Sequence, residues 1–255
     1  MKLHTALFLV IYIYSTALLA QTPLVAVASN MTHVMTDIAA RYRSISGKNV
    51  KLTFGSSGNF TRQIRQGAPY KIFLSAAGKY VDILSNNGLL QQPPVAYARG
   101  QIGLFIPKDS HLYKAADLAA VFNSLYYGDY RRIAIANPEH APYGVASIQA
   151  LQSGGLWAVE KDRLLVAENA AQVMQYTLSG GVDVGIIPAS FASLPVITEH
   201  GRFIPLPADW HQPIQQYLAL IHGAGKDSRD FYNFLLGEEA RALLTKSGYV
   251  VTDKD

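Results

Sequence analysis

The feature that most constrains the fold is a regular alternation between short β-type runs and longer helical patterns. Residues 24–28 form an apolar, β-type run, and apolar residues then recur at helical spacing until Gly47 interrupts the pattern. Two further β-type runs follow, at 50–54 and 70–75, with a short helical pattern at 60–66 between them. This alternation predicts an α/β protein whose mainly parallel sheet carries helices on both faces.

A break at residues 91–94, Gln-Gln-Pro-Pro, separates this unit from a second one of the same kind. Two long extended segments, 95–106 and 214–221, bracket the second unit. Such crossings are expected where one lobe is inserted into another and two strands form the hinge. We therefore predict two lobes, each a mixed sheet flanked by helices; one continuous sheet is the alternative. The predicted lobes comprise residues 21–102 with 212–255 (first lobe) and 103–211 (second lobe).

The first 20 residues have the organisation of a secretory signal peptide. Lys2 supplies a positive charge, residues 6–14 are apolar, and the small residues Ala17 and Ala20 offer cleavage sites. The apolar segment is shorter than the about 20 residues that a membrane-spanning helix needs. The chain contains no cysteine, which excludes a lipid-anchoring cysteine, disulfides and thiolate metal sites. We therefore expect residues 1–20 to be removed and the mature protein to lie free in the periplasm.

Polar junctions follow four of the predicted strands. In open α/β sheets ligands bind at the carboxyl ends of the strands, where helix N-termini present unpaired N–H groups. The tips of these junctions offer hydroxyl and main-chain donors but no Arg or Lys. Neutral donors can hold an oxyanion, because each hydrogen bond to a charged group contributes about 1.5–3 kcal/mol. The competing interpretation is that each junction only caps a helix. The four junctions are 28–30, 55–58, 138–144 and 168–170.

Two other functions compete with anion binding. A serine hydrolase would carry the nucleophile elbow Gly-x-Ser-x-Gly, but the glycines of residues 55–58 (GSSG) are out of register for either serine. The residues of a catalytic triad can lie far apart in sequence, so this mismatch makes a serine hydrolase less favoured without excluding it. A ferric-ion receptor could use Tyr126 and Tyr127 as oxygen ligands, but these residues precede a predicted strand and so lie at the wrong end for a cleft.

Taken together, the motifs at these junctions resemble those of the periplasmic molybdate-binding proteins of ABC transporters, the ModA family. The combination of the Ser-Ser loop leading into Arg-Gln-Ile with the Pro-Glu-His element is specific to that family. The resembling segments cover nearly the whole chain after the signal peptide, in the family's order: Ala26-Val27-Ala28-Ser29, residues 54–58 with Arg62-Gln63-Ile64, residues 66–69, residues 72–76, residues 137–144 and Gly185-Ile186-Ile187.

The resemblance implies a type II periplasmic binding fold whose two lobes close over a tetrahedral dianion, molybdate or tungstate. It implies a receptor that delivers this anion to the membrane permease of an ABC transporter, with no catalysis and no cofactor. Sulfate, another oxyanion or ferric ion stay open as alternative ligands. We expect a monomer, and the net charge of +4 is too small and scattered to indicate a nucleic-acid partner.

Matching the family's ligand positions gives five candidate residues. The first lobe supplies hydroxyl and main-chain donors from Ser29 and Ser56, with the Asn30 amide beside them. The second lobe supplies the main-chain N–H groups of Tyr143 and Ala170. The resemblance therefore implies an anion site made entirely of neutral donors, with no direct cation ligands.

Two further expectations concern neighbours of these residues. Ser57 is expected to cap the helix that follows it. Many family members carry a ligand-contacting Tyr after the Gly-Ile-Val type strand, whereas this chain has Pro188, which lacks both a hydroxyl and an N–H. One donor is therefore missing unless the phenol of Tyr143, at the rim of the same cleft, replaces it.

Overall fold

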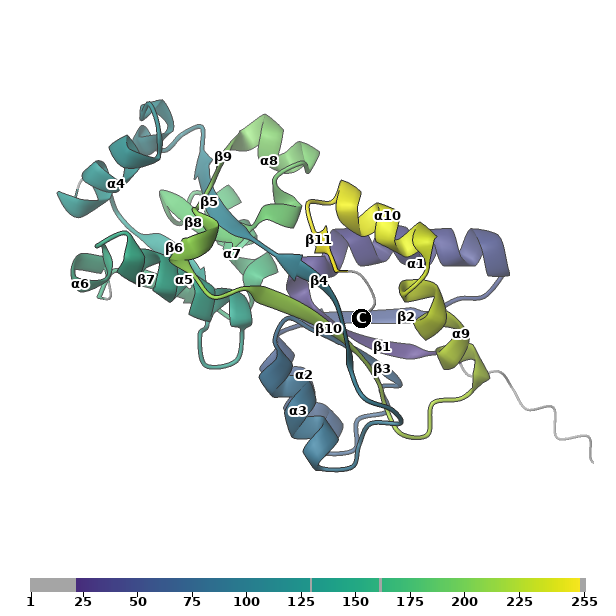
Figure 1. The fold of residues 1–255 in the computed structure, drawn as a ribbon. Coiled ribbons are helices and arrows are strands. Elements are labelled where there is room, and N and C mark those ends of the chain that lie inside the picture. Colours follow the sequence, from purple (N-terminus) through teal and green to yellow (C-terminus); the bar gives the residue numbers. More distant parts are fainter. Residues whose placement is uncertain (1–21, 129, 161, 253–255) are drawn as a thin grey trace, which may run out of the picture.

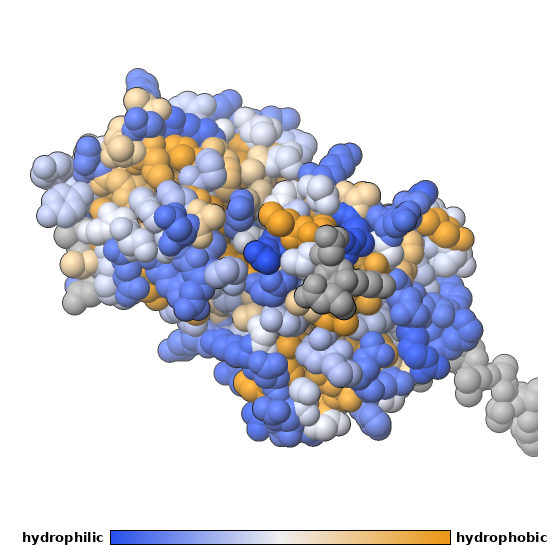
Figure 2. All heavy atoms as spheres, viewed as in Figure 1, coloured by the Kyte–Doolittle hydropathy of each residue, from blue (hydrophilic) through white to orange (hydrophobic). Residues whose placement is uncertain are grey.

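The computed structural model describes residues 22–128, 130–160 and 162–252, and the predicted signal peptide lies outside these ranges. Figure 1 shows two lobes, each built on a sheet with helices packed against it. The predicted two-lobed α/β architecture is therefore confirmed. Within the described ranges, no helix is both long enough and apolar enough to cross a lipid bilayer. The face shown in Figure 2 is largely hydrophilic, with apolar side chains in scattered groups on both lobes.

The sheet of the first lobe is mixed. Strand β1 pairs in parallel with β2 and β3, whereas β10 runs antiparallel to both β3 and β4. Residues 25–28 of β1 are all buried, because helices cover both faces of this part of the sheet; this explains their uninterrupted apolar run. In spatial order the strands are β11 (Val250–Val251), β4 (Val95–Gly100), β10 (Ile214–Leu220), β3 (Ile72–Ser75), β1 (Leu24–Ala28) and β2 (Lys51–Gly55).

Alternate residues of β1 face two different cores. Val25 and Val27 pack among side chains of α1, α9 and α10, and Ala26 packs on the other face among those of α2 and α3. Helix α1 ends at Gly47, whose left-handed φ of 71° lets its N–H reach the carbonyl of Arg43. The helices of this lobe are η1 (Ser29–Met31), α1 (Thr32–Ser46), α2 (Ser57–Arg65), α3 (Gly78–Asn86), α9 (Lys226–Leu235) and α10 (Glu238–Lys246).

The second lobe repeats this construction around its own sheet. Strand β6 pairs in parallel with β7 and β8, and β5 runs antiparallel to β8 and β9. In spatial order the strands are β7 (Leu164–Ala167), β6 (Ile133–Ala136), β8 (Val184–Pro188), β5 (Ile102–Pro107) and β9 (Gly201–Pro205). The helices are η2 (His111–Lys114), α4 (Leu118–Tyr126), α5 (Pro142–Ser153), α6 (Trp157–Glu160), α7 (Ala170–Leu178), η3 (Ala189–Phe191), α8 (Pro195–His200) and η4 (Ala208–Trp210).

The chain passes between the two sheets twice. The segment expected to be one extended run, 95–106, is two strands, because β4 joins the first sheet and β5 the second, with only Gln101 between them. The return passage runs from β9 to β10. Both connections lie side by side between the lobes in Figure 1.

Helix α5 starts unusually close to the strand that precedes it. A Cβ atom added to Gly144 would lie 2.1 Å from the carbonyl oxygen of Ala136, at the end of β6. Only glycine permits this approach, because the opposing atom belongs to the main chain and cannot rotate away. The glycine thus fixes the N-terminus of α5 over the carboxyl end of β6, facing the first lobe.

We expect Gly144→Ala to lower the free energy of unfolding by about 1–3 kcal/mol, the usual cost of forcing extra volume into a packed site. The measurement is urea unfolding of the ligand-free protein. Gly225→Ala is the matched control, since a Cβ there meets nothing within 4 Å and its φ of −78° suits alanine. Equal stability of the two variants would contradict this account of α5.

Candidate anion-binding site

The five residues predicted to bind the anion line one small cavity between the lobes. Its volume is about 190 Å³, counting the space at its mouth. Ser29 and Asn30 form the turn after β1, and Ser56 precedes α2. Tyr143 and Ala170 lie in the first turns of α5 and α7 in the second lobe. Residues from four separate strand-to-helix junctions therefore meet at one point.

Ser56 brings a buried hydroxyl without a hydrogen-bond partner to this cavity. It is the N-cap residue of α2, but its side chain accepts no capping hydrogen bond from the helix. Its Oγ is buried, with the residue 3% exposed, and has no hydrogen-bond partner. A buried hydroxyl without a partner is uncommon, because leaving it unsatisfied costs about 1–3 kcal/mol. The geometry leaves this oxygen free to bond a guest in the cavity.

The expectation that Ser57 caps α2 is wrong. Ser57 is the first residue of the helix, and its Oγ accepts a hydrogen bond of 3.1 Å from the N–H of Ala76. Ala76 directly follows β3, so the hydroxyl fastens the start of α2 to the neighbouring strand. The two adjacent serines thus differ in role: the Ser57 hydroxyl bonds to the main chain of the protein, whereas the Ser56 hydroxyl has no partner.

The second lobe presents main-chain donors. Pro142 opens α5 and has no N–H, so Tyr143 carries the first donor of that helix. At α7, the Oδ1 of Asn169 accepts hydrogen bonds from the N–H groups of Ala171 and Gln172. The N–H of Ala170 lies in the same first turn, where no carbonyl of the helix can accept it. Both N-termini therefore direct unpaired N–H groups and the positive ends of their dipoles at the cavity.

Asn30 can contribute only its main chain. Its Nδ2 donates to Oε1 of Gln216 at 3.0 Å and to the hydroxyl of Tyr249 at 2.9 Å, so both amide hydrogens are used inside the protein. The hydroxyl of Tyr143 is buried without a hydrogen-bond partner, and a Cβ on Gly100, the last residue of β4, would lie 2.0 Å from its oxygen. The phenol oxygen therefore lies inside the protein and not at an exposed rim, and its role as the replacement donor stays a prediction.

The phenols behind the cavity stay neutral. Burial raises the pKa of Tyr249 to about 12, and it raises the pKa of Tyr97 and of Tyr143 well above the ordinary value. A phenolate beside the cavity would repel an anion, so these shifts keep the surroundings free of negative charge at physiological pH. Among the residues that the structure describes, no charged side chain lines the cavity itself.

Direct contacts between the lobes lie beside the cavity. The N–H of Gly58 donates to the carbonyl oxygen of His140 at 2.9 Å, and a Cβ on this glycine would lie 2.7 Å from the Cβ of His140. Asn59 donates from Nδ2 to the carboxylate of Glu168, which also lies 3.5 Å from Nε2 of His140. The first turn of α2 is therefore fastened to the second lobe, and the structure is a closed form.

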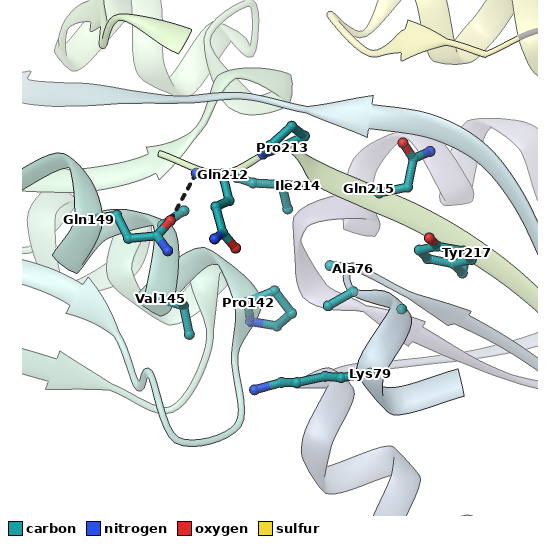
Figure 3. A pocket seen from close by; sticks show the side chains of 13 residues that line it. Ala76, Lys79, Pro142, Val145, Gln149, Gln212, Pro213, Ile214, Gln215 and Tyr217 are labelled. Carbon is teal, nitrogen blue, oxygen red and sulfur yellow. Dashed lines mark hydrogen bonds between the residues drawn. The ribbon is translucent and has the colours of Figure 1, made fainter. Parts of the chain in front are cut away.

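A larger pocket opens next to the cavity and shares Ala76 and Pro142 with it. Figure 3 shows the side chain of Lys79 extending from the start of α3 toward the α5 side of this pocket. Lys79 is exposed, and its ammonium group lies 4.8 Å from the ring centre of Tyr80. The pocket thus carries a solvated positive charge near the cavity without placing it inside.

The residues suggested for other functions lie elsewhere. Tyr126 and Tyr127, at the end of α4, are 55% and 82% exposed, their rings contact each other, and neither lines the cavity. Within the described ranges, no group of three or more His, Cys, Asp or Glu residues could hold a metal ion. Ser56 has no histidine partner, since its hydroxyl has no partner at all. Pro188 ends β8, is buried and does not line the cavity.

Comparisons with known proteins agree with this architecture. The family model of the bacterial extracellular solute-binding proteins matches residues 23–250. The chain is 31% identical to the molybdate-binding protein ModA of Azotobacter vinelandii, over 88% of each chain. It is 30% identical to the ModA protein of Rhodobacter capsulatus, over 88% of this chain and 86% of that protein.

The solved structure of the periplasmic molybdate-binding protein of Azotobacter vinelandii superposes with a TM-score of 0.82 at 28% identity, covering 91% of this chain and all of that one. The resemblance inferred from the junction motifs is therefore confirmed. The chain belongs to the bacterial extracellular solute-binding proteins and, within them, to the ModA family.

Proposed function

We propose that this protein captures molybdate or tungstate in the periplasm and delivers it to the membrane permease of an ABC transporter. The observation that carries the proposal is the buried, unpartnered hydroxyl of Ser56 at a cavity ringed by helix N-termini. A bound oxyanion would satisfy this hydroxyl and the N–H groups of Tyr143 and Ala170 together. The names of the relatives support the choice of molybdate among the oxyanions.

The donor set suits a fully ionised dianion. Hydrogen bonds to a charged acceptor contribute about 1.5–3 kcal/mol each, so five or six of them offset several kcal/mol of ion desolvation. The cavity volume of about 190 Å³ is also small. Because this volume includes the open space at the mouth, the enclosed part is smaller still, which favours a small guest such as a tetrahedral oxyanion over a larger organic ligand.

Release to a permease fits the same construction. Donors come from both lobes, so separating the lobes about the β4–β5 and β9–β10 connections would remove the donors of one lobe from the anion at once. Among the described residues, no cationic side chain lines the cavity to retain the anion in the open form. We infer that the receptor acts as a monomer, exported by its N-terminal signal peptide, and performs no catalysis.

We expect molybdate and tungstate to raise the melting temperature of the purified protein, and sulfate, phosphate and ferric citrate to have little effect. A ligand at a thousand times its Kd stabilises the folded form by about 4 kcal/mol. For a chain of this size that corresponds to about 8–16 °C. A thermal-shift panel at equal ligand concentrations measures this. A shift with ferric citrate alone would contradict the proposal.

We expect Ser56→Ala to weaken molybdate binding by about 10- to 100-fold, the loss of one hydrogen bond to a charged group. The ligand-free protein should be as stable as the wild type or slightly more so, because the removed hydroxyl has no partner. Ser57→Ala is the contrast: it leaves the N–H of Ala76 unpaired and should lower the ligand-free melting temperature. Calorimetric titration and thermal unfolding test both variants, and unchanged affinity in Ser56→Ala would overturn the site assignment.

We expect Lys79→Gln to slow molybdate association severalfold at low ionic strength while leaving dissociation unchanged. The charge lies outside the cavity, so it can attract an approaching dianion but cannot hold a bound one. The difference should vanish at high salt, where screening shortens the reach of the charge. Stopped-flow association rates at several salt concentrations test this. Lys51→Gln removes an equal charge at the opposite end of β2 and should have a smaller effect.

A further inference from the structure

A buried hydrogen-bond network behind the cavity joins both lobes at Asn30. The carbonyl oxygen of Asn30 accepts hydrogen bonds of 2.9 Å from two hydroxyls, those of Ser190 and Tyr249. These two hydroxyls lie 3.3 Å apart. The side-chain amide of Asn30 donates to Gln216 and to the oxygen of Tyr249, as described above. All four residues are buried.

The network saturates the carbonyl oxygen and the side-chain nitrogen of Asn30. A carbonyl oxygen has two lone pairs, and both have a donor here; an amide nitrogen has two hydrogens, and both have an acceptor. Tyr249 uses its single proton toward the Asn30 carbonyl and its oxygen toward the Asn30 amide. The main chain of Ser29 and Asn30, which lines the cavity, is therefore held by hydrogen bonds to the Asn30 carbonyl oxygen and side-chain nitrogen.

Two contacts of this network cross between the lobes, and both are made by Ser190: its bond of 2.9 Å to the Asn30 carbonyl and its contact of 3.3 Å with the Tyr249 hydroxyl. Asn30, Gln216 on β10 and Tyr249 before β11 belong to the first lobe, whereas Ser190 lies in η3 of the second lobe, directly after β8. Opening the lobes must break the bond from Ser190 to Asn30. The bonds among the three first-lobe residues can persist in either form. The Ser190 hydroxyl thus contacts the turn of Ser29 and Asn30 only when the lobes are closed.

We propose that Ser190 and Tyr249 are positioning residues for anion retention, which hold the Asn30 carbonyl and so fix the Ser29–Asn30 turn against the bound anion. This inference rests on the proposed function. Tyr249 holds the turn in both forms, and Ser190 adds its bond on closure and stabilises the closed form. Ser190 lies two residues after Pro188, where the family's tyrosine donor is missing. Its hydroxyl acts on the loop that faces the anion and not on the anion itself.

The test measures association and dissociation separately for Ser190→Ala and Tyr249→Phe. The full-length mature protein is loaded with radiolabelled molybdate, and release into an excess of unlabelled molybdate gives the dissociation rate. Rapid filtration after mixing gives the association rate. Thermal unfolding without ligand is recorded for each variant. Two controls remove matched hydroxyls within single lobes: Ser179→Ala, bonded to the carbonyl of Tyr176, and Tyr70→Phe, bonded to Gln63.

We expect Ser190→Ala to release molybdate about 3- to 10-fold faster, the effect of one neutral hydrogen bond, with an unchanged association rate. Its ligand-free melting temperature should equal that of the wild type, because the lost bond exists only in the closed form. Tyr249→Phe should also speed release, but it should lower the ligand-free melting temperature, since its partner Asn30 shares its lobe.

A purely structural role would lower the melting temperature of both variants and leave the ratio of the association rate to the dissociation rate of molybdate unchanged. Release from Ser190→Ala at the rate of the wild type or of Ser179→Ala would overturn the inference. Release from Tyr249→Phe at the rate of Tyr70→Phe would do the same for the phenol. A wild-type protein that retains no labelled molybdate would instead contradict the proposed function, so the two failures are distinguishable.

Discussion

Unpaired hydrogen-bond donors gathered at one buried point are the constraint on which the rest of this structure depends. Every helix leaves the N–H groups of its first turn without an intrahelical acceptor, and burying them without an acceptor is costly. Here the starts of α5 and α7 meet the loop of Ser56 and the turn after β1 at one cavity. Because no acidic side chain among the described residues lines that cavity, the arrangement is complete only when an anion is present.

The same constraint explains why the protein has two lobes. Neither lobe alone surrounds the cavity, so the donors converge only when α2 contacts the second lobe through Gly58 and His140. Close approach at Gly58 and Gly144 makes that convergence possible, since a Cβ at either position would collide with neighbouring atoms. The affinity for an anion and the closed arrangement of the lobes are therefore two aspects of one equilibrium.

The sequence predicted the features that are local in the chain. Strand-to-helix junctions carry their own signals in apolar periodicity and in glycine, proline and serine positions, and parallel strands bring their ends to one edge. Side-chain orientations depend on distant partners instead. Asn30 bonds to residues 186 and 219 positions away, and Ser57 bonds to Ala76 from a different strand end. No spacing rule reveals such pairs, so the engagement of Asn30, the direction of the Tyr143 phenol and the participation of Ser190 became visible only in three dimensions.

The single residue between β4 and β5 has a consequence for communication with a membrane partner. With only Gln101 separating strands of different sheets, relative motion of the lobes is concentrated in a few backbone dihedral angles. A rotation of one lobe about this connection displaces its outer end further than the end beside the connection. A transporter that contacts both outer ends would therefore distinguish the empty from the anion-bound receptor by the distance between these ends, without contacting the anion.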